Sequence, residues 1–79
     1  MRADRAYRLI LTRAGRAPAL FADATRVDRV EVVEIDSGEA VLFWDRPPQA
    51  ASRLARALRT DLHQLEAPEF IARWSTVES

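Results

Sequence analysis

The residues best suited to binding chemistry are basic and lie close together in the second half of the chain: Arg53, Arg56, Arg59 and His63. At about 100° per residue, the last three align as one ridge along a helix. Guanidinium groups on such a ridge can contact the phosphates of nucleic acid, or an acidic partner. The same pattern is typical of a solvated helix face, and no glycine-rich phosphate loop accompanies it. We therefore keep an anion- or nucleic-acid-binding module as an alternative that is not favoured.

Catalytic chemistry finds less support. His63 would need an orienting partner and a pocket to act as a general base, and the sequence indicates neither. Ser37 lies in DSGE, which is not the turn that presents a nucleophilic serine. Four carboxylates lie close together in the sequence, Asp28, Glu31, Glu34 and Asp36. Alternate strand residues point to opposite faces, and the spacing of a calcium loop is absent. We expect no enzyme, no metal site and no cofactor.

Composition excludes other classes of protein. The chain has 79 residues, a formal net charge of zero and no cysteine, so it is neither a polycation nor a disulfide scaffold. All 12 basic residues are arginine, which suggests a bacterial genome rich in G and C. No apolar run approaches the roughly 20 residues that span a bilayer, and the first residues lack the apolar region of a secretion signal. We expect a cytoplasmic protein without a membrane segment.

A helix over residues 48–66 is the clearest structural prediction. Its apolar residues recur at steps of three and four and form one stripe: Ala51, Leu54, Leu58, Leu62 and Leu65. Pro48 suits the first helical position, and Pro68 interrupts the helix and begins a shorter one over residues 68–74.

The first half of the chain reads as short strands. Residues 1–4 are expected to be a frayed end, and the predicted strands cover residues 5–13, 19–23, 27–36 and 40–45. Asp36 and Gly38 form a strong hairpin signal between the last two strands. The apolar face of the third strand switches between Val32 and Val33, which indicates either a β-bulge or a strand covered on both faces.

These elements predict a single α+β domain over residues 1–79. It is a four-stranded antiparallel meander with one long amphipathic helix packed on a face and a short C-terminal helix. A three-stranded sheet results if residues 19–23 are irregular.

The strand over residues 40–45 is apolar on both faces, whereas one helix covers only one face. If Val41 and Phe43 meet the helix, other apolar residues lie on the far face. We expect the following residues to contact a partner: Ile10, Leu42, Trp44, Phe70 and Trp74. The favoured function is a non-enzymatic protein-interaction module, working as a homodimer or with a protein partner. A small ligand-binding or enzymatic domain with a pocket between helix and sheet, near Trp44, is a second alternative.

Overall fold

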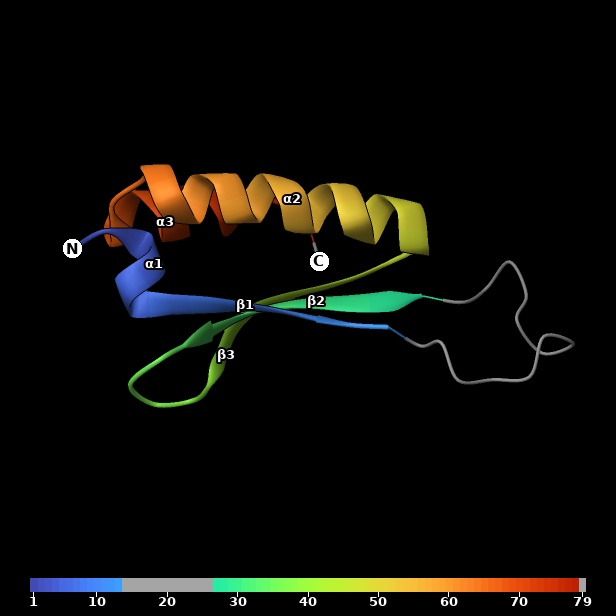
Figure 1. Ribbon diagram of the computed structural model, residues 1–79, viewed down its shortest axis with the longest axis horizontal. Helices are drawn as coiled ribbons and strands as arrows, with labels where there is room; N and C mark the ends of the chain where they lie inside the picture. Colours follow the sequence, from blue (N-terminus) through green and yellow to red (C-terminus); the bar gives the residue numbers. More distant parts are fainter. Residues whose placement is uncertain (14–26, 79) are drawn as a thin grey trace, which may run out of the picture.

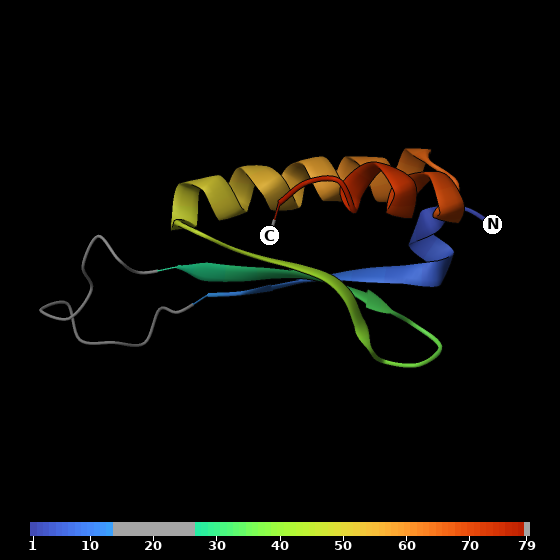
Figure 2. The ribbon, with the colours of Figure 1, turned by 180° about the vertical axis from the view of Figure 1, so that it is seen from behind.

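The fold is α+β, with an antiparallel sheet and a layer of helices on one side of it. The computed structural model describes residues 1–13 and 27–78. In chain order its elements are α1 (Ala3–Ala6), β1 (Tyr7–Thr12), β2 (Asp28–Glu34), β3 (Ala40–Arg46), α2 (Pro48–Gln64) and α3 (Ala67–Trp74). The strands follow the order β1-β2-β3, and α2 lies across one face of the sheet with α3 alongside it (Figures 1 and 2). The predicted strand over residues 19–23 lies outside the described residues, so the described sheet has three strands.

The register shifts between Val32 and Val33, where the sequence allows a bulge in β2, but the additional residue belongs to β3. β2 itself alternates regularly, so Val33 lies on the face opposite Val32. Val32 pairs with Leu42, and Val33 pairs with Ala40, so β3 contributes one residue more than β2. That residue is Val41. A bulge of this kind increases the local twist and bends the strand that carries the extra residue.

The long helix packs its apolar stripe on the sheet. Its buried residues are Ala51, Ala55, Leu58 and Leu62, and they join Val30, Val32, Trp44 and Phe70 in the core. The helix begins at Pro48 as predicted, and it ends at Gln64 because Leu65 is extended. The short helix α3 starts one residue before the predicted position, with Pro68 in its first turn. Among the described residues, none of these helices is both long and apolar enough to cross a bilayer.

The N-terminal residues are docked, which corrects the expectation of a frayed end. Ala3 is fully buried, and its backbone N–H donates to the carbonyl of Leu65 at 2.9 Å. The N–H of Ala67 donates to the carbonyl of Met1 at 2.8 Å, and the N-terminal ammonium lies 3.0 Å from a carboxylate oxygen of Glu66. Leu65, Glu66 and Ala67, at the junction of α2 and α3, thus supply hydrogen-bond and ion-pair partners that a terminal segment usually lacks.

Candidate interaction surfaces

The two faces of β3 are the reverse of the sequence-based assignment. Trp44 is 1% exposed and Leu42 is half-buried, so these two side chains lie under the helices. Val41 and Phe43, at 42% and 47% exposed, lie on the opposite face. The indole N–H of Trp44 donates to the carbonyl of Val77 at 3.2 Å, an acceptor that the helix side of the sheet provides. A buried tryptophan requires such an acceptor.

The aromatic residues of α3 also belong to the interior. Phe70 is fully buried, and its ring stacks on Tyr7 with centroids 6.0 Å apart. Trp74 is half-buried and packs edge-on against Trp44 at 6.1 Å. Of the five residues predicted to contact a partner, Ile10 alone lies on the exposed face of the sheet, where it is 39% exposed.

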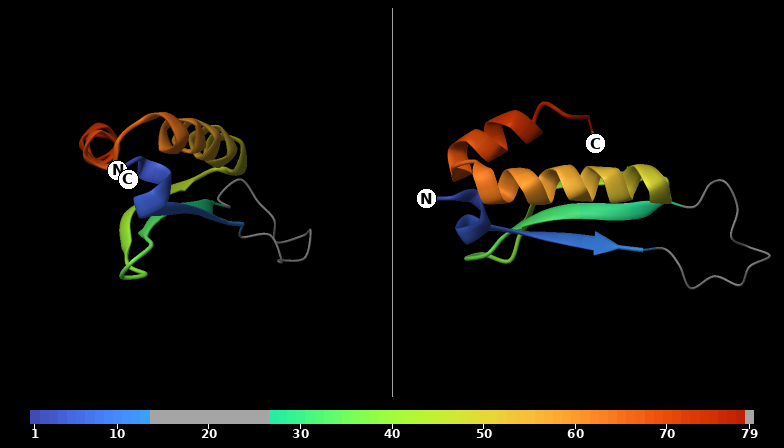
Figure 3. Two further views of the ribbon diagram at one scale, coloured as in Figure 1. Left: turned by 60° about the vertical axis from the view of Figure 1, so that its left-hand side comes forward. Right: turned by 45° about the horizontal axis from the view of Figure 1, so that its top comes forward.

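We call the face of the sheet that points away from the helices the open face. Strand alternation and the pairing register place these residues on it: Arg8, Ile10, Thr12, Arg29, Glu31, Val33, Val41, Phe43 and Asp45. The central row joins Ile10, Glu31 and Phe43 across the three strands. Figure 3 shows all the described helices on the other side of the sheet, so within residues 1–13 and 27–78 no element covers this face.

An ion pair holds part of the open face in place. The guanidinium of Arg29 donates to both carboxylate oxygens of Asp45, at 3.0 and 3.2 Å. It also lies over the ring of Phe43, 4.8 Å from the centroid. The hydrogen bond from Arg29, followed by its positive charge, lowers the pKa of the Asp45 carboxyl, and the same pairing raises the pKa of Arg29. Arg29 therefore lies over an aromatic ring, and the carboxylate of Asp45 balances its charge.

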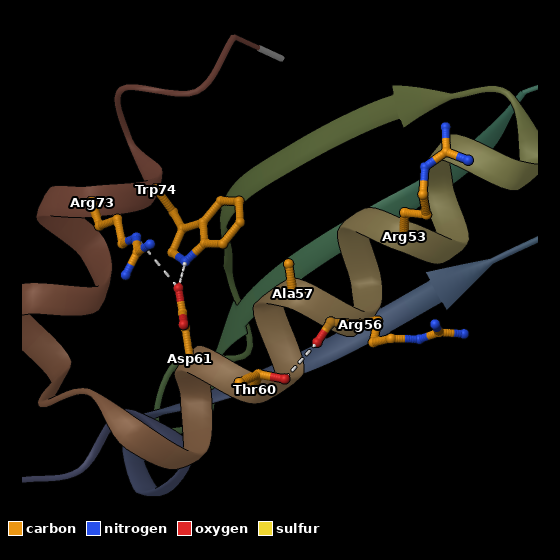
Figure 4. Close-up of a pocket in the computed structure, with 7 residues that line it drawn as sticks. All are labelled: Arg53, Arg56, Ala57, Thr60, Asp61, Arg73 and Trp74. Carbon is orange, nitrogen blue, oxygen red and sulfur yellow. Dashed lines mark hydrogen bonds and ion pairs between the residues drawn. The ribbon is translucent and has the colours of Figure 1, made fainter.

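A second surface lies between the two longer helices. We call it the α2–α3 groove; it is an open hollow of about 420 Å³, and Figure 4 shows the residues that line it: Arg53, Arg56, Ala57, Thr60, Asp61, Arg73 and Trp74. Its single carboxylate, Asp61, accepts a hydrogen bond from the indole of Trp74 at 3.0 Å and lies 3.5 Å from Arg73. Neither Arg53 nor Arg56 forms an ion pair with any residue that the structure describes.

The predicted basic ridge is divided by the fold. Arg53 and Arg56 line the α2–α3 groove, whereas Arg59 does not. His63 lies near the N-terminus instead, with its Nδ1 atom 3.1 Å from a carboxylate oxygen of Asp4. The groove gains Arg73 from α3, a residue that sequence reasoning missed because its position depends on how α3 packs against α2.

A smaller hollow of about 180 Å³ lies beside β3, near the place where the sequence allowed a pocket. The residues that line it are Val41, Leu42, Phe43, Trp44, Ser75 and Val77. Ser75 is the one residue of this lining with a polar side chain, so the lining brings together no pair of titratable groups for acid–base chemistry. The alternative of an enzymatic or ligand-binding pocket stays a prediction.

Comparisons with family models, with curated proteins and with solved structures give no match. Within the described parts of the chain, no cluster of three or more acidic, histidine or cysteine side chains is placed to hold a metal ion. The open face and the α2–α3 groove are therefore the surfaces from which a function can be argued.

Proposed function

We propose that the protein is a non-enzymatic interaction module that associates with a second copy of itself through the open face. The observation that supports this proposal is the exposure of Ile10, Val41 and Phe43 on one side of the sheet. Large apolar side chains gathered on one face are a feature of protein contact sites. Their burial against an apolar surface would be favourable by roughly 25 cal/mol per Å² of apolar area.

The charges of the open face favour a second copy over an unrelated partner. Arg8 and Arg29 balance Glu31 and Asp45, so the face is close to neutral. A twofold contact brings the same patch of both copies together, and the patch must then be complementary to itself. A face with equal numbers of acids and bases meets this condition, whereas a face of one sign would repel its copy.

The size of the open face sets the expected strength of the contact. Three strands about 4.8 Å apart and about 20 Å long present roughly 300 Å². Stable interfaces bury about 800 Å² on each partner, so this contact should be weak and reversible. We expect a monomer–dimer equilibrium that shifts towards the dimer as the protein concentration rises.

Sedimentation velocity over a range of concentrations tests the proposal, with the native chain compared with Phe43→Glu. At about 500 mM salt, where contacts between charged groups are screened, the native chain should show a growing dimer fraction. The variant should then stay monomeric and folded, because Phe43 is half exposed and outside the core. Ala72→Glu is the matched control, since it adds the same charge at an exposed position of α3. A native chain that remains monomeric throughout, or a dimer that Phe43→Glu leaves unchanged, would contradict the proposal.

The choice of position 43 matters for this test. Trp44→Glu, the neighbouring substitution, would place a carboxylate in the core, where a charge without a partner is strongly unfavourable. Loss of association in that variant would report unfolding and not the loss of a contact.

A further inference from the structure

We propose that the α2–α3 groove binds the acidic turn between β2 and β3 of another copy of the chain. The residues of this turn and of the groove are not among those of the open face. The contact therefore does not depend on the function proposed above. It assigns a role to two surfaces of opposite charge that the fold holds apart.

The side chains that line the groove carry more positive than negative charge. Arg53, Arg56 and Arg73 line it, and Asp61 is its one acidic residue. That carboxylate is engaged by the Trp74 indole and by Arg73, which leaves two guanidinium groups without an ion pair among the described residues. Figure 4 shows the side chains of Arg53 and Arg56 extending from α2 away from Asp61, Trp74 and Arg73, so the three guanidinium groups lie apart from one another. Spread charge suits a ligand with several separated carboxylates better than one compact anion.

The turn over residues 34–39 carries the opposite charge. Glu34, Asp36 and Glu39 fall within six residues that contain no base, and none of the three forms an ion pair with a described residue. Hydrogen bonds fix the shape of the turn: Gly38 donates to the carbonyl of Glu34, and Glu34 donates to the carbonyl of Glu39, each at 2.8 Å. The turn is therefore ordered before any contact forms, which lowers the entropy cost of docking.

The fold prevents the turn from reaching the groove of its own chain. The turn projects on the side of the sheet away from the helices, whereas the groove lies in the helix layer (Figures 1 and 3). A contact between them must join two copies. Two copies can exchange their turns across a twofold axis, or each copy can bind the next and so form a ring or an open chain.

The lining of the groove favours an acidic protein segment over single-stranded nucleic acid. Binding of unpaired bases requires aromatic faces on which they stack. Trp74 is the one aromatic residue of the lining; it is half-buried, its indole N–H is bound to Asp61, and its ring packs against Trp44. Carboxylates need only the guanidinium groups, which donate to them in a bidentate manner.

A charge-swap experiment tests the proposal by sedimentation. The groove variant is Arg53→Glu with Arg56→Glu, and the turn variant is Asp36→Arg with Glu39→Arg, each placed in the full chain carrying Phe43→Glu. All four positions are exposed, so both variants should fold, which circular dichroism checks. The Phe43→Glu chain should still form species larger than a monomer, weakened about tenfold between about 50 and 500 mM salt. Each swapped variant alone should lose them, and an equimolar mixture should regain them.

A mixture that stays monomeric would overturn the proposal, and so would an association that is insensitive to salt. Arg56→Glu and Arg59→Glu provide a matched pair one turn apart on α2, and only the first should weaken association, because Arg59 does not line the groove. If the groove variant instead loses affinity for a poly-glutamate peptide or for oligo(dT), while the Phe43→Glu chain never self-associates, the occupant is a foreign polyanion and the proposal fails. A failure of this kind leaves the concentration-dependent dimer of the native chain unaffected.

Discussion

The two faces of the sheet use alternate residues of the same strands and differ in what packs on them. On the helix side Val30, Val32 and Trp44 are almost completely buried beneath α2 and α3. On the open side Val41 and Phe43, the immediate neighbours of residues under the helices, keep more than two-fifths of their surface exposed. The difference shows that an apolar side chain of this sheet is buried only where the helices cover it, so its hydrophobicity alone does not determine how much it stabilises the fold.

The largest expected effect contrasts adjacent residues of β3. Trp44→Ala should lower the free energy of unfolding by about 3–5 kcal/mol, because it leaves a cavity in the core. Phe43→Ala should lower it by less than about 1 kcal/mol, because a half-exposed ring loses little burial. Urea denaturation followed by circular dichroism measures both. Similar losses for the two variants would mean that the open face is packed as firmly as the covered one.

A second substitution weakens the packing of α2 on the sheet. Leu58→Ala removes a fully buried side chain from the middle of α2 and should cost about 2–5 kcal/mol of unfolding free energy. Arg59→Ala, one residue along the helix, should change it by no more than about 0.5 kcal/mol. The same urea titration compares them. An equal cost at both positions would show that the apolar stripe does not direct the packing of α2.

A third substitution acts on the turn between β2 and β3. Gly38 has a φ of 74°, and a Cβ atom there would meet no other atom within 4 Å. Gly38→Ala should therefore cost about 1 kcal/mol from backbone conformation alone. Gly38→Asn is the matched variant and should cost less, since asparagine tolerates this conformation better. Equal losses for the two variants in thermal unfolding would contradict this explanation.

The smallest expected effect concerns the ion pair on the open face. Arg29→Gln should return the pKa of Asp45 upward to its ordinary range, which a carboxyl carbon titration by NMR detects. Because folding lowers this pKa, the pair contributes stability above the unfolded pKa and loses it as the pH falls through the folded value. The contribution should be small because both groups are exposed to solvent. A pKa that Arg29→Gln leaves unchanged would contradict the assigned cause.

The sequence predicted the elements that rest on local patterns. The apolar stripe and Pro48 located α2 to within two residues at its end, and Pro68 located α3 to within one. Each of these signals depends on neighbours in the chain, so no knowledge of tertiary packing was needed.

The faces of β3 could not be predicted in the same way. Both faces are apolar, and the choice depends on the carbonyl of Val77, which accepts the Trp44 N–H from 33 residues away. The α2–α3 groove has the same limitation, because Arg73 joins Arg53 and Arg56 only through the packing of one helix on another. Properties that arise from contacts distant in sequence leave no periodic signal.

The docked N-terminus has a consequence for the order of folding events. The side chain of Arg2 donates to the carbonyl of His63, 61 residues along the chain, and Ala3 is bonded to Leu65. Closing a loop of this length costs chain entropy that local turns and helices do not incur, and contacts of such separation slow folding. We expect the hairpin of β2 and β3 and the helix α2 to form early, and the amides of Ala3 and Ala67 to acquire protection from hydrogen exchange last.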